Sequence, residues 1–501
     1  GWAKMASTVL VGIDIGSSSV KAGVWRTDGY YRAAFRTARV VRPEGSAGAE
    51  QDPDQIWAAV IECLDEVMDG QAPGAVRGVG LSGHGPSLIA VDSYGRALSN
   101  IVTWMDPRPL QDARVREILC QRAGEASGAP ESSSARESSG APAPSGPSFE
   151  ATAVWLHRKL LEDGHDLARE GVLLLQPKDY IGLMLTGSVW IDRSAASCMS
   201  WPAGGDPAQS LFPSMVDPWQ RAGEVSPVAS GETGLPEGTP VAAGGIDAFV
   251  EALGAGVIRP GIACDSTGTS TCLAMAAPGG GFSLPTVEHV APGRRLAVIP
   301  VSYSGGALAW AMSMMMPDVF RGQRDWTSPV REAVEGSAPG AAGLTFIPHM
   351  TGRRSPSANP RVRGALIGLD PVHTASDVIR SVLEGCAYAM QECVEECMPG
   401  EAVAELRAVG SGARHDAWLQ MKADILRAPV VRMKVCEGAL AGAVVLAGAA
   451  AGVFEDVEDG VGAVVRPEAK FEPTQDPEVC AAYSDGAARF RRAEASLETA
   501  W

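Results

Sequence analysis

The chain has 501 residues, which is more than one hydrophobic core normally serves, so two domains are expected. Hydrophobic residues make up 46% and charged residues 20% of the chain, a composition typical of globular proteins. The formal net charge of −17 and the lack of any basic run argue against nucleic acid or an anionic membrane as a partner. No apolar run reaches the length of a membrane span, and the first residues lack a signal-peptide pattern, so a cytoplasmic protein is predicted.

The ten cysteines are scattered without a repeated Cys-x-x-Cys spacing. Cys393 and Cys397 lie one helical turn apart, but they lack neighbouring His or Cys residues that would complete a metal site. Reduced thiols that mostly fill the core are therefore predicted, as in a cytosolic protein.

A β-hairpin is predicted at the start of the chain. Residues 9–15 and 20–25 are short apolar and β-branched runs, separated by a glycine and three serines at 16–19. Such a turn can aim several backbone N–H groups at one point, and glycine permits a close approach, which suits phosphate oxygens. Asp14 lies at the end of the first strand, where its carboxylate either holds Mg²⁺ through water or simply caps the turn.

Two loop-like segments, 83–86 and 103–108, carry polar side chains beside an indole. Trp104 can stack on the apolar face of a sugar or polyol, while His84 and Asp106 can bind its hydroxyl groups. The alternatives are a tryptophan of the core and a solvated pair between Asp106 and its neighbouring arginine.

Composition changes sharply over residues 123–148, which consist mostly of Ser, Gly, Ala, Pro and Glu. A surface excursion without a packed core is predicted there. Helical periodicity resumes over 151–161 and appears again over 376–397, where apolar residues are spaced for one buried face.

Asp247 is the candidate for acid–base chemistry. Gly244 and Gly245 precede it, and an apolar, helix-like run follows at 248–253. Glycines let the backbone deliver a carboxylate into a cleft, and phosphoryl transfer needs a group that accepts the proton of the acceptor hydroxyl. The alternative is an Asp that only caps the helix, and spacing does not decide between the two roles.

A second strand–turn–strand pattern spans residues 261–275, with its turn at 265–271. Two similar turns in one chain suggest two related halves. Further along, 409–414 is a glycine-rich turn after an apolar strand, suited to approach by a nucleotide ring or ribose. Residues 438–452 are rich in Ala and Gly, which allows close packing of a helix against a neighbour or ligand.

Taken together, these segments resemble the FGGY family of carbohydrate kinases, a branch of the actin-like ATPase superfamily. The resemblance covers nearly the whole chain outside 123–148, and the motifs follow the order of the family. The matching segments are 12–21 (first phosphate motif), 103–106 (sugar loop), 177–187 (Lys-Asp-Tyr to Leu-Thr-Gly), 244–256 (catalytic Asp), 266–271 (second phosphate motif), 346–369 (C-terminal signature), and 409–414 with 439–442 (adenosine-binding turn and adjoining helix).

The resemblance implies two RNase H-like α/β domains, at 5–254 and 255–495, each a mixed sheet flanked by helices, with an interdomain cleft whose closure excludes water. It implies ATP and Mg²⁺ as cofactors, a sugar or polyol as substrate and a homodimer. The implied site residues are Asp247 as general base; His84, Trp104, Asp106 and Asp247 for the substrate; Asp14 for the metal; and Gly16, Ser17, Ser18, Ser19, Lys21, Thr267, Gly268, Thr269, Gly410, Ser411, Gly412 and Ala413 for ATP.

The resemblance points to the reaction more directly than to the substrate, because the chain departs from the family's xylulokinase pattern at two places. Xylulokinases of this family usually show Gln-Met-His where this chain has His-Gly-Pro at 84–86, and an Asn after the catalytic Asp where this chain has Ala248. Lost hydrogen-bonding groups change substrate preference by orders of magnitude. A ketopentose such as xylulose leads, followed by another ketose or a sugar alcohol such as erythritol.

An alternative of a different class is a catalytically silent actin-like module that binds nucleotide or sugar, since a fold does not determine a function. The presence of both Asp14 and Asp247 argues against it, because a sensor needs neither a metal ligand nor a base.

Overall fold

The computed structural model describes residues 8–43, 46–72, 74–118, 120, 148–201, 205–277, 285–322, 325–397 and 403–500. The chain forms two compact units. Unit 1 comprises residues 1–250, 287–293 and 439–464, and unit 2 comprises residues 251–286, 294–438 and 465–501. Each unit is built around its own β-sheet.

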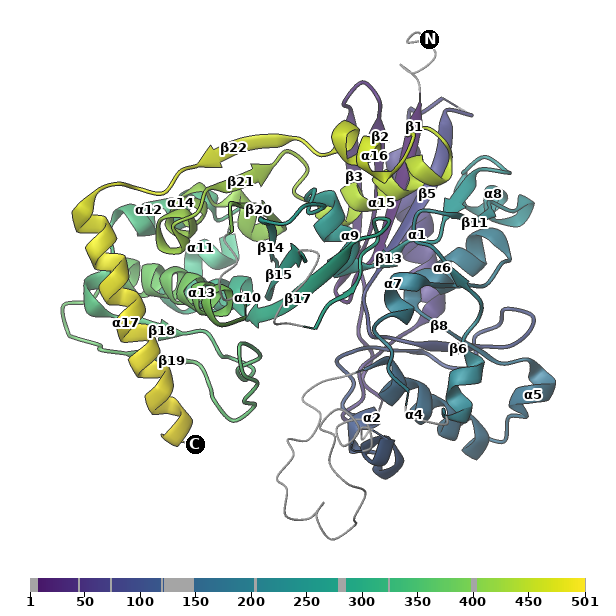
Figure 1. Ribbon diagram of the computed structural model, residues 1–501, viewed down its shortest axis with the longest axis horizontal. Helices are drawn as coiled ribbons and strands as arrows, with labels where there is room; N and C mark the ends of the chain where they lie inside the picture. The colour runs from purple at the N-terminus through teal and green to yellow at the C-terminus, as the bar shows by residue number, and fades with distance from the viewer. Residues whose placement is uncertain are drawn as a thin grey trace. The chain divides into compact units, whose positions relative to one another are not determined.

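The sheet of unit 1 is mixed, with strand order β11-β12-β5-β1-β2-β3, and β13 also pairs with β5 (Figure 1). β1 runs antiparallel to β2 and parallel to β5, which confirms the predicted first hairpin. Burial of the alternating apolar residues of these strands creates one core cluster. The strands are β1 (Val9–Ile15), β2 (Ser19–Arg26), β3 (Tyr31–Thr37), β5 (Val76–Gly83), β11 (Arg221–Glu224), β12 (Pro240–Ala242) and β13 (Gly245–Ile246).

Helices cover both faces of this sheet. A Cβ on Gly80 of β5 would lie 1.9 Å from the carbonyl oxygen of Ala443 in α15 (Gly438–Ala450). The next residue, Leu81, points to the opposite face, where its side chain approaches Gly182 of α6 (Pro177–Thr186). The predicted architecture, a mixed sheet flanked by helices, is confirmed for this unit.

Three glycines explain why α15 returns to the first sheet from so far along the chain. Gly12 of β1 pairs with Gly80 of β5, and a Cβ on Gly12 or Gly78 would lie 2.8 or 2.6 Å from a carbonyl oxygen of α15. Because the strands have no side chains at these positions, their backbone packs directly against the backbone of the Ala- and Gly-rich helix. Figure 1 shows the yellow α15 beside the purple β1 and β2.

The predicted domain limits, 5–254 and 255–495, stay a prediction. The two compact units are divided differently along the chain, because residues 287–293 and 439–464 pack with unit 1.

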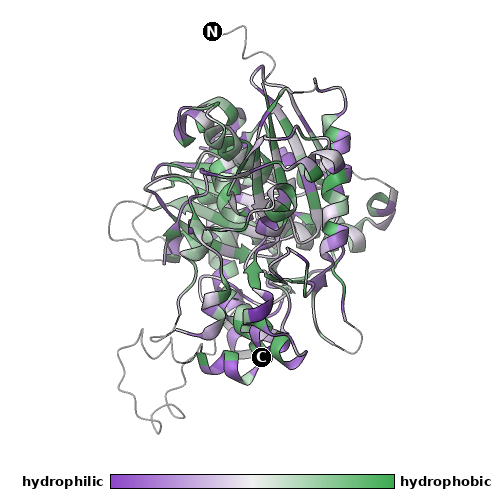
Figure 2. Ribbon diagram, turned by 90° about the vertical axis from the view of Figure 1, so that its right-hand side faces the viewer, coloured by the Kyte–Doolittle hydropathy of each residue, from purple (hydrophilic) through white to green (hydrophobic). Residues whose placement is uncertain are grey.

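Unit 2 repeats the same theme. Its strands run in the order β17-β15-β14-β20-β21-β22, with β14 antiparallel to β15 and parallel to β20, so the second predicted hairpin is also confirmed. Across the described chain, Figure 2 shows helices that carry a green side and a purple side. The strands are β14 (Ile262–Thr267), β15 (Thr271–Ala276), β17 (Arg295–Ser302), β20 (Glu405–Val409), β21 (Val430–Met433) and β22 (Pro467–Phe471).

The three predicted helical stretches are helices in the structure: α4 (Phe149–Glu162), α9 (Asp247–Gly254) and α13 (Ala375–Cys397). Ser148 caps α4, since its hydroxyl accepts from the N–H of Ala151 at 3.1 Å. The rest of the predicted excursion at 123–148 lies outside the described residues. No helix among the residues described is long and apolar enough to cross a membrane.

The remaining elements are short or flank the two sheets. They are β4 (Glu50–Gln51), β6 (Ile89–Val91), β7 (Ile101–Val102), β8 (Leu173–Leu175), β9 (Ile191–Asp192), β10 (Met215–Val216), β16 (Val287–Glu288), β18 (Thr345–Ile347), β19 (Ala365–Ile367), α1 (Pro53–Met68), α2 (Arg108–Gln111), α5 (Leu167–Glu170), α7 (Arg193–Ala196), α8 (Pro227–Thr233), α10 (Ser304–Met315), α11 (Pro317–Gly322), α12 (Thr327–Glu335), α14 (Asp416–Leu426), α16 (Val457–Val464), α17 (Pro477–Ala500), and the 3₁₀ turns η2 (Pro207–Leu211), η3 (Ala341–Gly343) and η4 (Ser411–Arg414).

The cysteines are free thiols, as predicted. Only part of them fills the core. Cys63, Cys264, Cys386, Cys393 and Cys397 are buried, Cys120 is exposed, and Cys198, Cys272, Cys436 and Cys480 are partly buried.

Candidate active site

Asp247 follows a short strand whose position depends on glycine. Gly244 has a φ of 75°, and a Cβ there would lie 2.2 Å from the carbonyl oxygen of Leu81, so only glycine allows this approach to β5. β13 then pairs with β5, with Gly245 opposite Ser82. α9 begins at Asp247, which places its carboxylate where the strand ends.

Asp14 lies at the same edge of the sheet. It pairs across the sheet with Ser82 of β5, and Ser82 in turn pairs with Gly245 of β13. Because β1, β5 and β13 run parallel, their carboxyl ends meet at one edge, which is where ligands bind in open α/β sheets. The fold therefore brings the predicted metal ligand and the predicted base into one neighbourhood.

The charges of this neighbourhood are unbalanced. Asp14 is buried; the hydroxyl of Ser82 donates to its Oδ1 at 2.8 Å, and the Nζ of Lys21 lies 3.6 Å from its Oδ2. Burial, followed by the negative charge of Asp14, raises the pKa of Asp247 to about 7, against the opposing effects of the Ala248 N–H and Lys21. A carboxyl group with this pKa can exchange a proton near neutral pH, as a general base must.

The alternative role of Asp247 as a helix cap has one contact in its favour. Its Oδ1 accepts from the N–H of Ala248 at 2.8 Å, and Asp247 stands in the first turn of α9. This bond uses one carboxylate oxygen and is compatible with proton transfer at the other. The assignment of Asp247 as the base stays a prediction.

The predicted phosphate turn is the loop between β1 and β2. The N–H of Gly16 donates to the carbonyl of Ser19 at 2.9 Å, and a Cβ on Gly16 would lie 2.8 Å from that oxygen. Ser18 is exposed, whereas the carbonyls of Gly16 and Ser17 accept from the amide nitrogen of Gln51 at 3.4 and 3.1 Å. The turn is thus anchored through its carbonyl groups, and its binding of phosphate stays a prediction.

Trp104 and Asp106 lie in the loop after β7, but in different surroundings. Trp104 is partly exposed, so part of its surface is available to a ligand. The Asp106 carboxylate is fully buried beside Arg108, and its Oδ2 accepts from the N–H of Ala49 at 2.9 Å. The alternative of a solvated Asp–Arg pair is wrong: Arg108 also pairs with Glu50, so Asp106 holds the loop from inside.

His84, the third predicted substrate residue, is 1% exposed. Its Nδ1 is 2.8 Å from the hydroxyl of Ser87, and its Nε2 is 2.9 Å from Oε1 of Gln51. Burial lowers its pKa to about 4, so the ring is neutral at physiological pH. Both ring nitrogens already have protein partners, and a direct contact with sugar would have to replace one of them.

A buried ion cluster supports the chain just before Asp247. The Nζ of Lys178 and the indole N–H of Trp190 each donate to the carbonyl of Ala243 at 3.2 Å. Lys178 also pairs with Asp192 at 2.9 Å and with Asp179, and all three side chains are buried. Burial raises the pKa of Asp179 to about 6. The cluster fixes the strand end that carries the predicted base.

Sequence reasoning did not find Gln51 or Ser87, and it noted Lys178 only within a family motif. Gln51 precedes a helix that starts with Asp52 as cap and Pro53, a signal for a helix and not for a site. Ser87 belongs to no sequence motif that would indicate a site. Lys178 offered a usable signal, because a lysine in a largely apolar segment must find a carboxylate if it is buried.

In unit 2, the second predicted phosphate turn rests on a buried ion pair. The Nζ of Lys422 lies 2.5 Å from Asp265 and 3.0 Å from the hydroxyl of Thr267. That hydroxyl also contacts Asp265 at 2.6 Å and Thr271 at 2.9 Å. Thr267 is therefore fixed from several sides, while Gly268 and Thr269 follow it at the tip.

The predicted adenosine turn packs directly against this hairpin. Gly410 has a φ of 79°, and a Cβ there would lie 2.6 Å from the carbonyl oxygen of Thr267. A Cβ on Gly412 would lie 2.5 Å from the Thr267 side chain. The two turns of unit 2 are thus neighbours, and Ser411 and Ala413 form part of the 3₁₀ turn η4.

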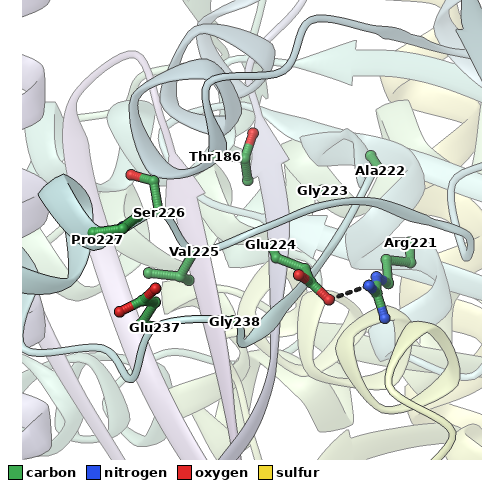
Figure 3. Close-up of a pocket in the computed structure, with 10 residues that line it drawn as sticks. All are labelled: Thr186, Arg221, Ala222, Gly223, Glu224, Val225, Ser226, Pro227, Glu237 and Gly238. Carbon is green, nitrogen blue, oxygen red and sulfur yellow. Dashed lines mark hydrogen bonds and ion pairs between the residues drawn. The ribbon is translucent and has the colours of Figure 1, made fainter.

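Unit 1 also has a surface hollow of about 550 Å³ near strand β11. Figure 3 shows its lining, in which Arg221 and Glu224 form an ion pair. The lining residues are Thr186, Arg221, Ala222, Gly223, Glu224, Val225, Ser226, Pro227, Glu237 and Gly238. None of the predicted site residues is among them, so this hollow has no part in the predicted chemistry.

Comparisons with known proteins identify the family of the chain. Residues 9–202 match the model of the FGGY family of carbohydrate kinases, N-terminal domain, and residues 264–451 match that of the C-terminal domain. The xylulose kinase of Bacillus subtilis (strain 168) is 27% identical over 496 residues, which cover 93% of this chain and 92% of that protein. A gluconokinase of Bacillus licheniformis is 26% identical over 507 residues, which cover 94% and 93%.

A solved structure supports the fold. The ligand-bound xylulose kinase from Lactobacillus acidophilus matches with a TM-score of 0.79 and 20% identity, over 98% of both chains. The two family models together span most of the chain, and the chain therefore belongs to the FGGY family of carbohydrate kinases. It is a xylulokinase-like carbohydrate kinase with the two-domain fold of the actin-like ATPases.

Proposed function

We propose that this kinase transfers the γ-phosphoryl group of ATP to a hydroxyl of a ketose, with a ketopentose such as xylulose as the leading substrate. The observation that carries the proposal is the pairing of two acidic groups at the carboxyl ends of β1 and β13. Asp14 is buried there, and the pKa of Asp247 is raised to about 7. A module that only bound nucleotide would need neither group.

In this proposal the ionised Asp247 accepts the proton of the acceptor hydroxyl. The hydroxyl oxygen then forms a bond to the γ-phosphorus while the bond to the leaving oxygen of ADP breaks. The proton ends on the Asp247 carboxylate, which a pKa near neutrality allows. The ion cluster around Lys178 holds the preceding strand end in place through Ala243.

Asp14 suits the proposed Mg²⁺ site. Mg²⁺ is usually held by one or two carboxylates together with phosphate oxygens and water, and not by a full protein cage. The Oδ1 of Asp14 is bonded to Ser82 and its Oδ2 is 3.6 Å from Lys21, so the carboxylate is oriented by the protein. When bound, Mg²⁺ would offset the negative charge of the phosphate oxygens.

For ATP, we propose binding by the predicted turns. In unit 1 these are Gly16, Ser17, Ser18 and Ser19 with Lys21, whose ammonium lies near the end of β1. In unit 2, Thr267, Gly268 and Thr269 would bind phosphate oxygens, and Gly410, Ser411, Gly412 and Ala413 would bind adenosine. Glycine at 410 and 412 lets this turn pack against Thr267, so the proposed adenosine turn lies beside the second proposed phosphate turn.

The sugar side is proposed to centre on Trp104, whose partly exposed indole can stack on a sugar face. Asp106 would hold the shape of that loop through its bond with Arg108. His84 would support the loop through its buried hydrogen bonds. Among the relatives, proteins named xylulose kinase and gluconokinase have nearly equal identity. Another ketose or a sugar alcohol such as erythritol is the alternative substrate.

We further propose that the protein is a homodimer in the cytoplasm. Its proposed domain limits are 5–254 and 255–495.

A coupled ADP-release assay with Mg²⁺ and ATP tests the function. The panel would contain ketopentoses, ketohexoses, gluconate, tetritols, pentitols and glycerol, compared by kcat/KM. We expect one ketopentose to exceed the others by at least tenfold. A leading gluconate or tetritol would replace the substrate and keep the reaction, whereas no acceptor above background, with ATP bound in calorimetry, would favour the silent module.

A further inference from the structure

A chain of buried hydrogen bonds in unit 1 joins the sugar loop to the phosphate turn. The N–H of Trp104 lies 3.0 Å from the hydroxyl of Ser87, which lies 2.8 Å from Nδ1 of His84. The Nε2 of His84 lies 2.9 Å from Oε1 of Gln51. The amide nitrogen of Gln51 reaches the carbonyls at the phosphate turn, at 3.1 Å for Ser17.

The chemistry of the two ends decides the direction of every bond. The carbonyls of Gly16 and Ser17 can only accept, so the Gln51 amide must turn its NH₂ group toward them and its oxygen toward His84. The Nε2 of His84 must then carry the proton, and Nδ1 must accept from the hydroxyl of Ser87. The oxygen of Ser87 in turn accepts from the backbone N–H of Trp104.

The side chains of the network are buried. Gln51 and Ser87 are 0% exposed and His84 is 1% exposed, so water cannot replace a lost partner cheaply. Burial lowers the pKa of His84 to about 4, which keeps the neutral ring that this sequence of donors and acceptors requires. The backbone of His84 is also tied to the strand before the turn, since its N–H donates to Ile15 at 2.9 Å.

We infer that Gln51, His84 and Ser87 are positioning residues that hold the sugar loop and the phosphate turn in a common register, so that each end depends on the ring of His84. The inference rests on the proposed function for the roles of the two ends. It assigns His84 a place behind the substrate, in keeping with its burial and its two protein partners.

Two substitutions divide the network at the ring. In His84→Gln, the amide can still reach Gln51 from the position of Nε2, but the acceptor for Ser87 is lost. In His84→Asn, the amide oxygen can still accept from Ser87 near the position of Nδ1, but the donor to Gln51 is lost. Each variant therefore keeps one half of the chain of bonds and breaks the other.

The kinetic readout is the KM for each substrate, with the best acceptor of the panel. His84→Gln is expected to raise the KM for the sugar by about 3- to 10-fold, the worth of one net hydrogen bond, and to leave the KM for ATP within twofold. His84→Asn is expected to show the reverse. Equal changes in both KM values in both variants, or none in either, would overturn the inference, because general destabilisation cannot distinguish the two substrates.

Amide hydrogen exchange gives a readout without turnover, so the inference is tested even if no acceptor is found. His84→Gln should speed exchange in the peptide that contains Trp104, and His84→Asn in the peptide that contains residues 16–19. The same change in both peptides in both variants would contradict a divided network. An inactive wild-type enzyme with the expected exchange pattern would reject the proposed function alone.

Discussion

The two hairpins that carry the predicted phosphate turns treat their carboxylates in opposite ways. Asp14 in unit 1 has Lys21 only at 3.6 Å, and its charge helps to raise the pKa of Asp247. Asp265 in unit 2 lies 2.5 Å from the buried Lys422, whose ammonium also lies 4.4 Å from the ring of Trp418. The same local pattern thus leaves two neighbouring carboxylates at a strand end in one unit and a carboxylate paired with a buried lysine in the other.

This difference follows from the strands that lie next to each hairpin more than from the residues of the hairpins themselves. In unit 1, a third parallel strand, β13, brings a second carboxylate to the edge beside the first. In unit 2, the neighbour of β14 is β20, which leads into the glycine turn at Gly410 and not into an acidic residue. An edge with two carboxylates and one nearby lysine suits chemistry with protons and cations, and a neutral one suits binding.

The largest effect is expected at Asp247, the proposed base. Asp247→Asn should lower kcat by about 10² to 10⁴-fold, the usual contribution of a positioned base, and should leave ATP binding nearly unchanged. The assay is ADP release with the best acceptor, beside calorimetry with ATP. Asp54→Asn is the matched control, because Asp54 is an exposed acid in the first turn of α1. An active Asp247→Asn would remove the central assignment.

The second prediction concerns the neutralised hairpin. Lys422→Met leaves Asp265 buried without its ammonium, so the loss of stability should reach about 3–5 kcal/mol. Lys470→Met is the control, since its pair with Glu472 is exposed and should matter by less than about 1 kcal/mol. Thermal melting compares them. Adding Asp265→Asn to Lys422→Met should recover part of the loss, and no recovery would mean that packing alone is at work.

The pH dependence of the reaction tests the imbalance at Asp247. Because the ionised carboxylate is the active base and its pKa is about 7, kcat/KM should fall about tenfold per unit below that pH. The profile is measured with the acceptor at low concentration. Asp14→Asn removes one cause of the raised pKa, so any remaining activity should show its acid limb at lower pH. An unmoved limb would assign the titration to another group.

Trp104→Ala should raise the KM for the sugar about tenfold, the contribution of an aromatic contact, and change the KM for ATP by less than twofold. Trp201→Ala offers a comparison at another partly exposed indole of unit 1. Steady-state kinetics with both substrates varied decides the matter. Equal losses for sugar and ATP would make Trp104 a packing residue.

The last prediction concerns how the stability of the fold depends on pH. The folded pKa of Asp247 is about 7, above the ordinary 3.8 of the unfolded chain, so the folded state retains a proton that the unfolded state has lost. Stability from this group is present below about pH 4 and is lost as the pH rises through 7. The difference in Tm between Asp247→Asn and wild type should therefore grow from pH 4 to 7 and then level off. A difference that shrinks with pH would reverse the sign of the shift.

Local patterns in the sequence predicted the parts of the fold that depend on local physics. Both hairpins and helices α9 and α13 follow from alternation, glycine turns and helical spacing. The return of α15 to the first sheet did not, because it depends on Gly12 and Gly80 meeting across two strands. Such complementarity between distant segments leaves no periodic signal.

The site shows the same limit. The sequence could name Asp14 and Asp247 as candidates at one sheet edge, because both stand at strand ends and Asp247 follows two glycines. The sequence could not show that Asp106 is already paired with Arg108, or that His84 has partners on both ring nitrogens. Those facts depend on contacts between residues that are separated along the chain, and each contact decides whether a polar group is offered to a ligand or used by the protein.

The glycine stripe that receives α15 has a consequence for how the protein is made. Residues 439–464 belong to unit 1, so the sheet of that unit stays uncovered on one face while the ribosome synthesises most of unit 2. At the usual 5–20 residues per second this delay lasts roughly 10 to 40 s. During that time one face of the first sheet lacks its helix, and the first unit can complete its fold only after residues 439–464 have been synthesised.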